Sequence, residues 1–168
     1  MCLYARMEET AKIKISITIY MSIRQFRTIV KEVERYLGHN DTTDADELYK
    51  AGKHYLGKKF RGVYPRDKLP KLKDGQSMII NLDTSKQSGS HWIAIYCSGN
   101  SYVVYDSFGR KIIGGILPRM TFSGCGKKII TSPDYDAEQK TYETDCGQNS
   151  LGWLIFVYEY GITKGLKI

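Results

Sequence analysis

The fold is decided by the stretch HWIAIYCSGNSYVVYD, residues 91–106, which predicts two antiparallel strands joined by a tight turn. The two runs, 91–97 and 101–106, are rich in β-branched and aromatic residues, which favour strands. Gly99 and Asn100 lie between them and are typical of a short hairpin turn. A hairpin at the centre of the chain therefore predicts an antiparallel part of the sheet.

The register of this hairpin brings a histidine and an acid together. A two-residue loop pairs Ser98 with Ser101 and, further along, Ile93 with Asp106. Because side chains alternate between the faces of a strand, His91 then shares a face with Ile93 and Asp106. A four-residue loop keeps this arrangement, whereas a three-residue loop would put the histidine and the acid on opposite faces. The same face gains an apolar floor from Ile93, Ile95, Cys97, Tyr102 and Val104.

A carboxylate beside an imidazole fixes the orientation of the ring and stabilises its protonated form. Such a pair can activate a nucleophile, and the remaining question is which residue that is. Cys146 begins the apolar stretch 146–161, which is predicted to be a buried helix ending at Gly161. The unpaired N–H groups and the macrodipole of a helix start favour a thiolate. Gly147 would let a substrate backbone approach closely. A lone cysteine is commonly a small buried apolar residue, and a His/Asp pair is commonly a satisfied surface pair. The prediction of a catalytic site depends on finding them together.

The first third of the chain is predicted to contain one strand and two helices. Residues 12–20 alternate polar and apolar side chains, as an amphipathic strand does. Helical spacing begins at Ser22 and continues to Leu37. A second helix is predicted after the capping-type residues 41–43. Met21 precedes the first helix, so residues 1–20 have an alternative interpretation as a leader that the domain could dispense with.

The rest of the chain predicts further strands with irregular connections. Residues 60–70 are rich in Gly and Pro and are predicted to be irregular, and a short helix is expected near residues 112–117 of the loosely regular stretch 107–126. Strands are predicted at 77–82 and 127–132. The whole predicts one α+β domain over residues 1–168, with a central mixed or antiparallel sheet packed against helices.

Composition narrows the class of protein. Hydrophobic residues make up 42% and charged residues 26% of the 168, which indicates a globular domain rather than a disordered chain. No apolar run is long enough to span a membrane, and the N-terminus lacks a secretory signal core, so secretion is not expected. The four cysteines lack CxxC spacing, which predicts neither a metal site nor a disulfide framework. The net charge of +7 is compatible with a DNA partner, although the lysines are spread along the chain.

The order of these residues resembles that of the adenovirus-type (adenain-like) and SUMO-protease-type (Ulp-type) cysteine proteases, which share one fold. The matching pieces are HW at 91–92, YDSFG at 105–109, Gln139, and DCG at 145–147 followed by an apolar helix. The resemblance covers roughly residues 60–160. It implies that His91 is the general base, Asp106 its orienting acid and Cys146 the nucleophile. It further implies that the Gln139 side chain completes the oxyanion hole and that Trp92 and Gly147 border the substrate cleft.

Several features resemble the adenovirus-like branch, and in particular the proteases of Polinton/Maverick-type elements. The chain is short, Gln139 precedes Cys146 by seven positions, and FRGVYPRDKLP at 60–70 precedes an INL strand. Two features resemble the SUMO-protease branch instead: the acid is Asp106 where adenovirus enzymes usually carry Glu, and the DCG tripeptide is frequent there.

The resemblance implies a monomeric endopeptidase that cuts viral precursor polypeptides near small, Gly-containing motifs during virion maturation. It places the protein in the virion and in the host nucleus or cytoplasm. No cofactor is required for the chemistry, but an activating peptide and DNA are expected partners, and Cys125 is a candidate for a disulfide with such a peptide. The alternatives are a SUMO or ubiquitin-like deconjugase, a related acyltransferase, and a DNA-binding protein that retains the triad without catalysis.

Overall fold

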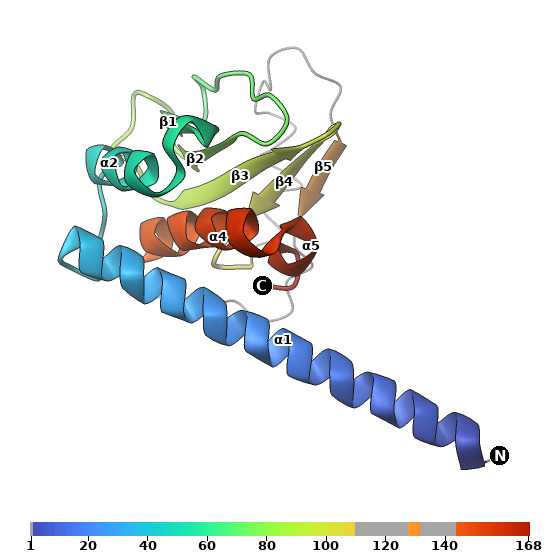
Figure 1. Cartoon of the computed structure of the whole chain (residues 1–168). Helices are drawn as coiled ribbons and strands as arrows, with labels where there is room; N and C mark the ends of the chain where they lie inside the picture. Colours follow the sequence, from blue (N-terminus) through green and yellow to red (C-terminus); the bar gives the residue numbers. More distant parts are fainter. Residues whose placement is uncertain (1, 110–127, 132–143) are drawn as a thin grey trace.

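The computed structural model describes residues 2–109, 128–131 and 144–168 (Figure 1). Along the chain the elements are α1 (Cys2–Leu37), α2 (Ala45–Leu56), the 3-10 turn η1 (Gly57–Lys59), β1 (Phe60–Pro65), β2 (Ser77–Asn81), β3 (Trp92–Ser98), β4 (Ser101–Tyr105), β5 (Lys128–Thr131), α4 (Cys146–Tyr160) and α5 (Ile162–Gly165). The helix expected near residues 112–117 lies outside the described residues. In the part of the chain that is described, no helix combines the length and the apolar character needed to cross a membrane.

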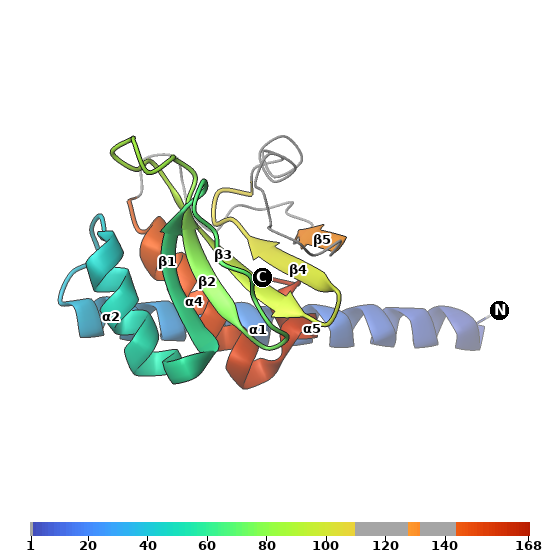
Figure 2. The ribbon, with the colours of Figure 1, turned by 90° about the horizontal axis from the view of Figure 1, so that it is seen from above.

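The sheet is mixed, as expected, with the strand order β1-β2-β3-β4-β5. The three central strands are antiparallel, whereas β1 pairs with β2 and β5 pairs with β4 in parallel. Helix α4 lies across one face of the sheet, and α1 packs on the far side of α4 (Figures 1 and 2). The result is an α+β fold in which α4 forms the buried middle layer.

The predicted two-residue hairpin is confirmed. Ser98 pairs with Ser101 and Ile95 pairs with Val104, and Gly99 in the turn has a φ of +53°, which glycine adopts without strain. One face of the hairpin builds the predicted apolar floor, in which all the expected side chains are buried: Ile93, Ile95, Cys97, Tyr102 and Val104. The opposite face packs into the core that contains α4.

The apolar stretch after Cys146 forms the predicted buried helix. In α4 every residue from Gly147 to Val157 is buried, and the helix ends before Gly161. On its far side α1 contributes a stripe at helical spacing: Phe26, Ile29, Val30 and Val33. A side chain at Gly152 would collide with Val30, so α1 and α4 approach each other closely at this point.

The strand predicted at residues 12–20 is wrong, and so is the helix start at Ser22. Both lie within α1, and the Ser22 hydroxyl donates to the Thr18 carbonyl at 3.0 Å, across the expected boundary. Ile13, Ile15 and Ile17 are 54–58% exposed, so their alternation buries no face. Among the described residues no strand pairs with them, whereas a continuing helix satisfies the backbone hydrogen bonds locally. This part of α1 extends beyond the sheet (Figure 1).

Two further boundaries differ from the expectation. Residues 60–65 form β1 instead of irregular chain, with a register shift between Phe60 and Val63 around Gly62. As an edge strand β1 tolerates this bulge, and Pro65 stands at its end, where a missing N–H does little harm. The second helix is confirmed, but its N-cap is Asp44, one residue after the expected group 41–43.

Candidate active site

His91 and Asp106 meet at one end of the hairpin, as its register predicted. His91 immediately precedes β3 and Asp106 immediately follows β4, and Nε2 of the imidazole lies 2.7 Å from Oδ1 of the carboxylate. Each residue is only 3% exposed. The backbone N–H of Phe108 also donates to Oδ1 at 3.0 Å, and its ring lies 4.6 Å from the imidazole. The carboxylate is therefore held in place to orient the histidine.

The surroundings of His91 favour its protonated form. Burial is the largest single influence and lowers the pKa of His91, but Asp106 and the Cys146 thiol together outweigh it and raise the pKa above its ordinary value. Because Nε2 is bonded to the carboxylate, the nitrogen left for the thiol is Nδ1. Nδ1 is buried and makes no hydrogen bond to a described residue. A buried ring nitrogen without a hydrogen bond costs free energy. Nδ1 is therefore the atom that can exchange a proton with a thiol that comes within reach.

Cys146 is the first residue of α4 and is half-buried. Its backbone N–H belongs to the first turn of the helix, where N–H groups have no partner within the helix and the macrodipole favours negative charge. Cys146 thus combines a helix start with a nearby histidine, the two features that support a reactive thiolate. Within the described part of the chain, no cluster of three or more His, Cys, Asp or Glu side chains could hold a metal ion.

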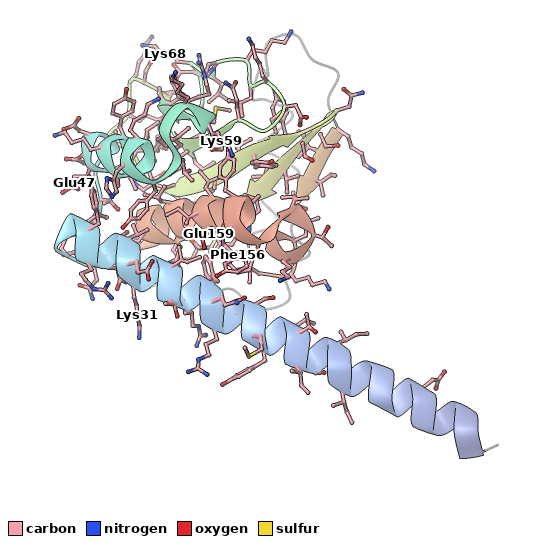
Figure 3. All side chains as sticks on the ribbon, viewed as in Figure 1. Lys31, Glu47, Lys59, Lys68, Phe156 and Glu159 are labelled. Atoms are coloured by element: carbon pink, nitrogen blue, oxygen red, sulfur yellow. The ribbon has the colours of Figure 1, made fainter. Side chains whose placement is uncertain are left out.

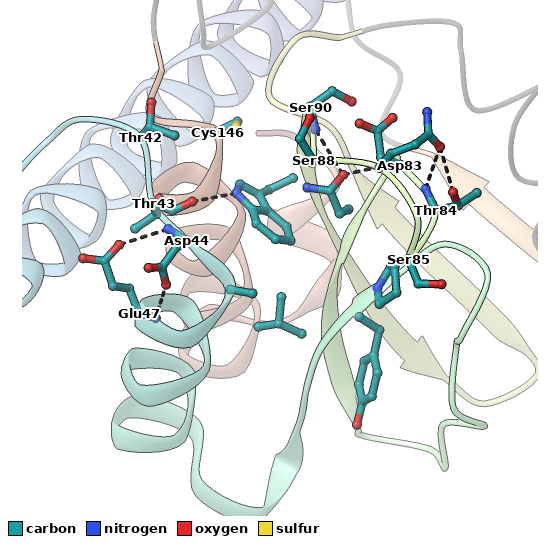
Figure 4. Close-up of a pocket in the computed structure, with 18 of the residues that line it drawn as sticks. Thr42, Thr43, Asp44, Glu47, Asp83, Thr84, Ser85, Ser88, Ser90 and Cys146 are labelled. Carbon is teal, nitrogen blue, oxygen red and sulfur yellow. Dashed lines mark hydrogen bonds between the residues drawn. The ribbon is translucent and has the colours of Figure 1, made fainter.

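The thiol faces a cleft of about 690 Å³ (Figure 4). One wall is formed by residues 42–47, at the start of α2, and the opposite wall by the loop 83–90. Trp92 and Phe108 contribute apolar surface between the walls, and Cys146 borders the same space. A concave site of this size, with apolar surface and a few polar groups, is typical of a ligand-binding site.

The other expected site residues have different positions. Trp92 lines the cleft, and its indole N–H donates to the Thr43 carbonyl at 3.0 Å. Gly147 is buried, and a side chain there would collide with the Thr43 hydroxyl, so packing explains this glycine. It is not among the residues that line the cleft, and its expected role beside a substrate stays a prediction. Gln139 and Cys125 lie outside the described residues.

Sequence reasoning missed Gln148, which ties one wall of the cleft to α4, the helix that begins at Cys146. Its side chain is fully buried, its Nε2 donates to the Asp41 carbonyl at 2.6 Å, and its Oε1 accepts from the Thr43 hydroxyl at 2.9 Å. The Thr144 hydroxyl adds a bond to the Asp41 carboxylate at 2.9 Å. The available signal was the polar run from Gln148 to Ser150 at the start of a helix predicted to be buried, since buried polar side chains need partners.

We expect Gln148→Leu to lower the free energy of unfolding by about 2 kcal/mol, because the Thr43 hydroxyl and the Asp41 carbonyl lose their partner. Urea denaturation measures this loss. Gln148→Glu is the matched variant: it retains the acceptor for Thr43 but loses the donor to Asp41. Equal stability of Gln148→Leu and the unmodified chain would show that this buried network does not hold the wall.

No protein-family model matches the chain, and no curated protein matches it in sequence. The residues and the geometry of the site are therefore the only guide to its function.

Proposed function

We propose that the chain is a cysteine peptidase in which Cys146 attacks the carbonyl carbon of a peptide bond. The observation that carries the proposal is a buried imidazole bonded to Asp106 at 2.7 Å and interacting with the Cys146 thiol at the end of a cleft. A nucleophile, a base and an orienting group in this relation are the parts that acyl transfer requires.

The chemistry follows from these positions. His91 takes the thiol proton on Nδ1, and the thiolate sulfur adds to the carbonyl carbon. As the tetrahedral intermediate collapses, the imidazolium returns its proton to the leaving amine and a thioester remains on Cys146. Water, deprotonated by His91, then releases the carboxylic acid and the free thiol. The backbone N–H of Cys146 supplies one donor for the oxyanion, and Gln139 is proposed as the second.

We further propose the adenain/Ulp-type fold and, within it, the adenovirus-like branch. Three of the four pieces that carry the resemblance lie at element boundaries and support this proposal: HW spans the start of β3, YDSFG begins on the last residue of β4, and DCG spans the start of α4. The proposed substrates are viral precursor polypeptides cut near Gly-containing motifs during virion maturation. The proposed setting is the virion and the host nucleus or cytoplasm, with a peptide or DNA as activator.

Alkylation of the native protein by iodoacetamide across pH tests the proposed chemistry. We expect Cys146 to react below pH 7 while the other thiols lag, because a thiolate paired with an imidazolium persists at acid pH. Peptide mass spectrometry identifies the modified cysteine at each pH. His91→Ala should remove this selectivity. If Cys146 in the unmodified chain reacts only as fast as an ordinary thiol, the proposed ion pair is absent.

The deconjugase alternative is favoured by the aspartate at position 106 and by the DCG tripeptide, and it needs its own test. A SUMO or ubiquitin probe with a reactive group after Gly-Gly labels the nucleophile of such an enzyme. Rapid covalent labelling of Cys146 would count against the maturation role, whereas cleavage of unfolded polypeptides without labelling would support it.

A further inference from the structure

We infer that the cleft selects a basic polypeptide segment and that Asp83 pairs with a lysine or arginine of that segment. The inference rests on the proposed function, since it names the class of substrate for the same cleft. It makes Asp83 a specificity-determining residue.

The charge of the cleft is opposite to that of the chain. Lys and Arg number 25 and Asp and Glu 18 among the 168 residues, which gives a net charge of +7. Among the described residues that line the cleft there is no lysine or arginine, whereas three carboxylates are present: Asp44, Glu47 and Asp83. They lie on both walls, with Asp44 and Glu47 across the cleft from Asp83 (Figure 4). A segment between these walls would therefore face charged lining side chains that are all acidic.

Two of the three carboxylates are already engaged. Oδ1 of Asp44 accepts the backbone N–H groups of Asp46 and Glu47 at 2.8 Å each, and Glu47 accepts the backbone N–H of Asp44 at 3.0 Å. This capping box stabilises the start of α2. Glu47 also lies 3.1 Å from the His39 imidazole. These two side chains supply negative charge but have few acceptor sites left for a ligand.

Asp83 differs from them because its backbone is fixed while its carboxylate is unpaired. Its N–H donates to the Asn81 side chain at 2.9 Å, and its carbonyl accepts the Arg66 N–H at 3.2 Å. The Asn81 side chain also accepts the Ser90 N–H at 3.2 Å and so closes the loop on itself. The carboxylate of Asp83 makes no hydrogen bond or ion pair with a described residue, and the residue is half-buried. The backbone contacts therefore fix where the side chain leaves the loop, and the carboxylate is available to a cation.

The surroundings favour a long cationic side chain as the occupant. Trp92, Phe108 and Val63 provide apolar surface on which the methylene stem of Lys or Arg can pack while its charged end reaches a carboxylate. A nucleic acid is disfavoured here, because its phosphates would meet three carboxylates. The structure thus points to a peptide with a basic residue in the part that occupies the cleft.

Peptide binding to the Cys146→Ser variant tests this inference without requiring turnover. Fluorescein-labelled peptides share a Gly-Gly centre in a neutral scaffold and carry Lys, Gln or Glu in the flanks, and fluorescence anisotropy gives each Kd. We expect Lys peptides to bind about fivefold more tightly than Gln peptides, and Glu peptides to bind most weakly, since a partly exposed ion pair contributes at most about one kcal/mol. The difference should shrink at high salt.

The matched variants separate Asp83 from the general charge of the chain. On the Cys146→Ser background, Asp83→Asn should reduce the preference for Lys over Gln peptides to below about twofold. The loss of affinity for Lys peptides should depend on the salt concentration. Glu159→Gln makes the same change of charge at an exposed residue in the last turn of α4 (labelled in Figure 3) and should leave the preference unchanged. A preference for Glu peptides, a preference that survives Asp83→Asn, or no measurable binding of any peptide would overturn the inference.

Turnover by the unmodified enzyme distinguishes this failure from failure of the proposed function. If Lys, Gln and Glu peptides are all cut at the same kcat/KM, the peptidase assignment stands and the inference fails. If Lys peptides bind through Asp83 but no peptide is cut and Cys146 is unreactive, the cleft is a binding site for basic segments and the peptidase assignment fails.

Discussion

Asp106→Asn is expected to lower kcat/KM by about 10³-fold or more for a peptide whose cleavage depends on Cys146. It is also expected to move the alkaline limb of the kcat/KM profile to lower pH. Asp106 bonds to Nε2 of His91 and is one of the two groups that raise the pKa of that histidine. Without the carboxylate the pKa of His91 falls, so the imidazolium is lost at a lower pH. A kcat/KM profile across pH measures both changes.

Stability gives an independent check of the same interaction. Because the folded-state pKa of His91 is raised above 6.5, its pairing stabilises the fold fully below about pH 6.5, and this contribution is lost as the pH rises through the raised value. The stability difference between the unmodified chain and Asp106→Asn should therefore be larger at pH 6 than at pH 9. Glu159→Gln serves as the control for an exposed carboxylate. An alkaline limb at the same pH in both proteins would mean that Asp106 does not raise the pKa of His91.

Trp153→Ala is expected to lower the free energy of unfolding by about 3–5 kcal/mol, the usual cost of truncating a buried tryptophan. Trp153 is fully buried at the middle of α4, stacks on Tyr105 with ring centroids 5.3 Å apart, and donates its indole N–H to the Gly165 carbonyl at 2.9 Å. The substitution leaves a cavity between α4 and the sheet, and the Gly165 carbonyl keeps only the longer bond from the Ile168 N–H at 3.3 Å. Urea denaturation measures the loss.

Two matched variants provide reference values for the loss of stability expected of Trp153→Ala. Trp153→Phe retains an aromatic ring against Tyr105 and loses the hydrogen bond, so its cost should be smaller than that of the alanine variant. Tyr20→Ala removes an aromatic side chain that is 66% exposed, and should change stability by less than about 0.5 kcal/mol. A loss below 1 kcal/mol for Trp153→Ala would show that α4 is not the centre of the core.

The central hairpin and α4 could be predicted from the sequence because each depends on local information. The turn Gly99-Asn100 sets a two-residue loop, and strand alternation then determines the positions of His91 and Asp106. The length of the apolar stretch after Cys146 and the glycine at its end determined the helix. That the helix brings the thiol to the histidine depends on tertiary packing, and only the resemblance indicated it.

The errors arose where the local pattern and the tertiary environment disagree. The alternating isoleucines at 13, 15 and 17 have the period of a strand, but they are part of α1 and no strand of the described sheet pairs with them. The glycine and proline in 60–65 indicated a loop, but these residues complete the sheet edge by parallel pairing with β2. Pairing between separate segments leaves no periodic signal of its own. Gln148 was missed because its partners, Asp41 and Thr43, are more than one hundred positions away.

The order of the elements along the chain has a consequence for synthesis on the ribosome. Helix α1 and the hairpin emerge before α4, so the stripe Phe26, Ile29, Val30 and Val33 is only partly covered until α4 follows, with Phe26 packed on Tyr105 of β4. Cys146 emerges later than His91 and Asp106, so the three side chains cannot come together on a shorter nascent chain. Any chemistry that needs all three is therefore absent until α4 has been made and packed.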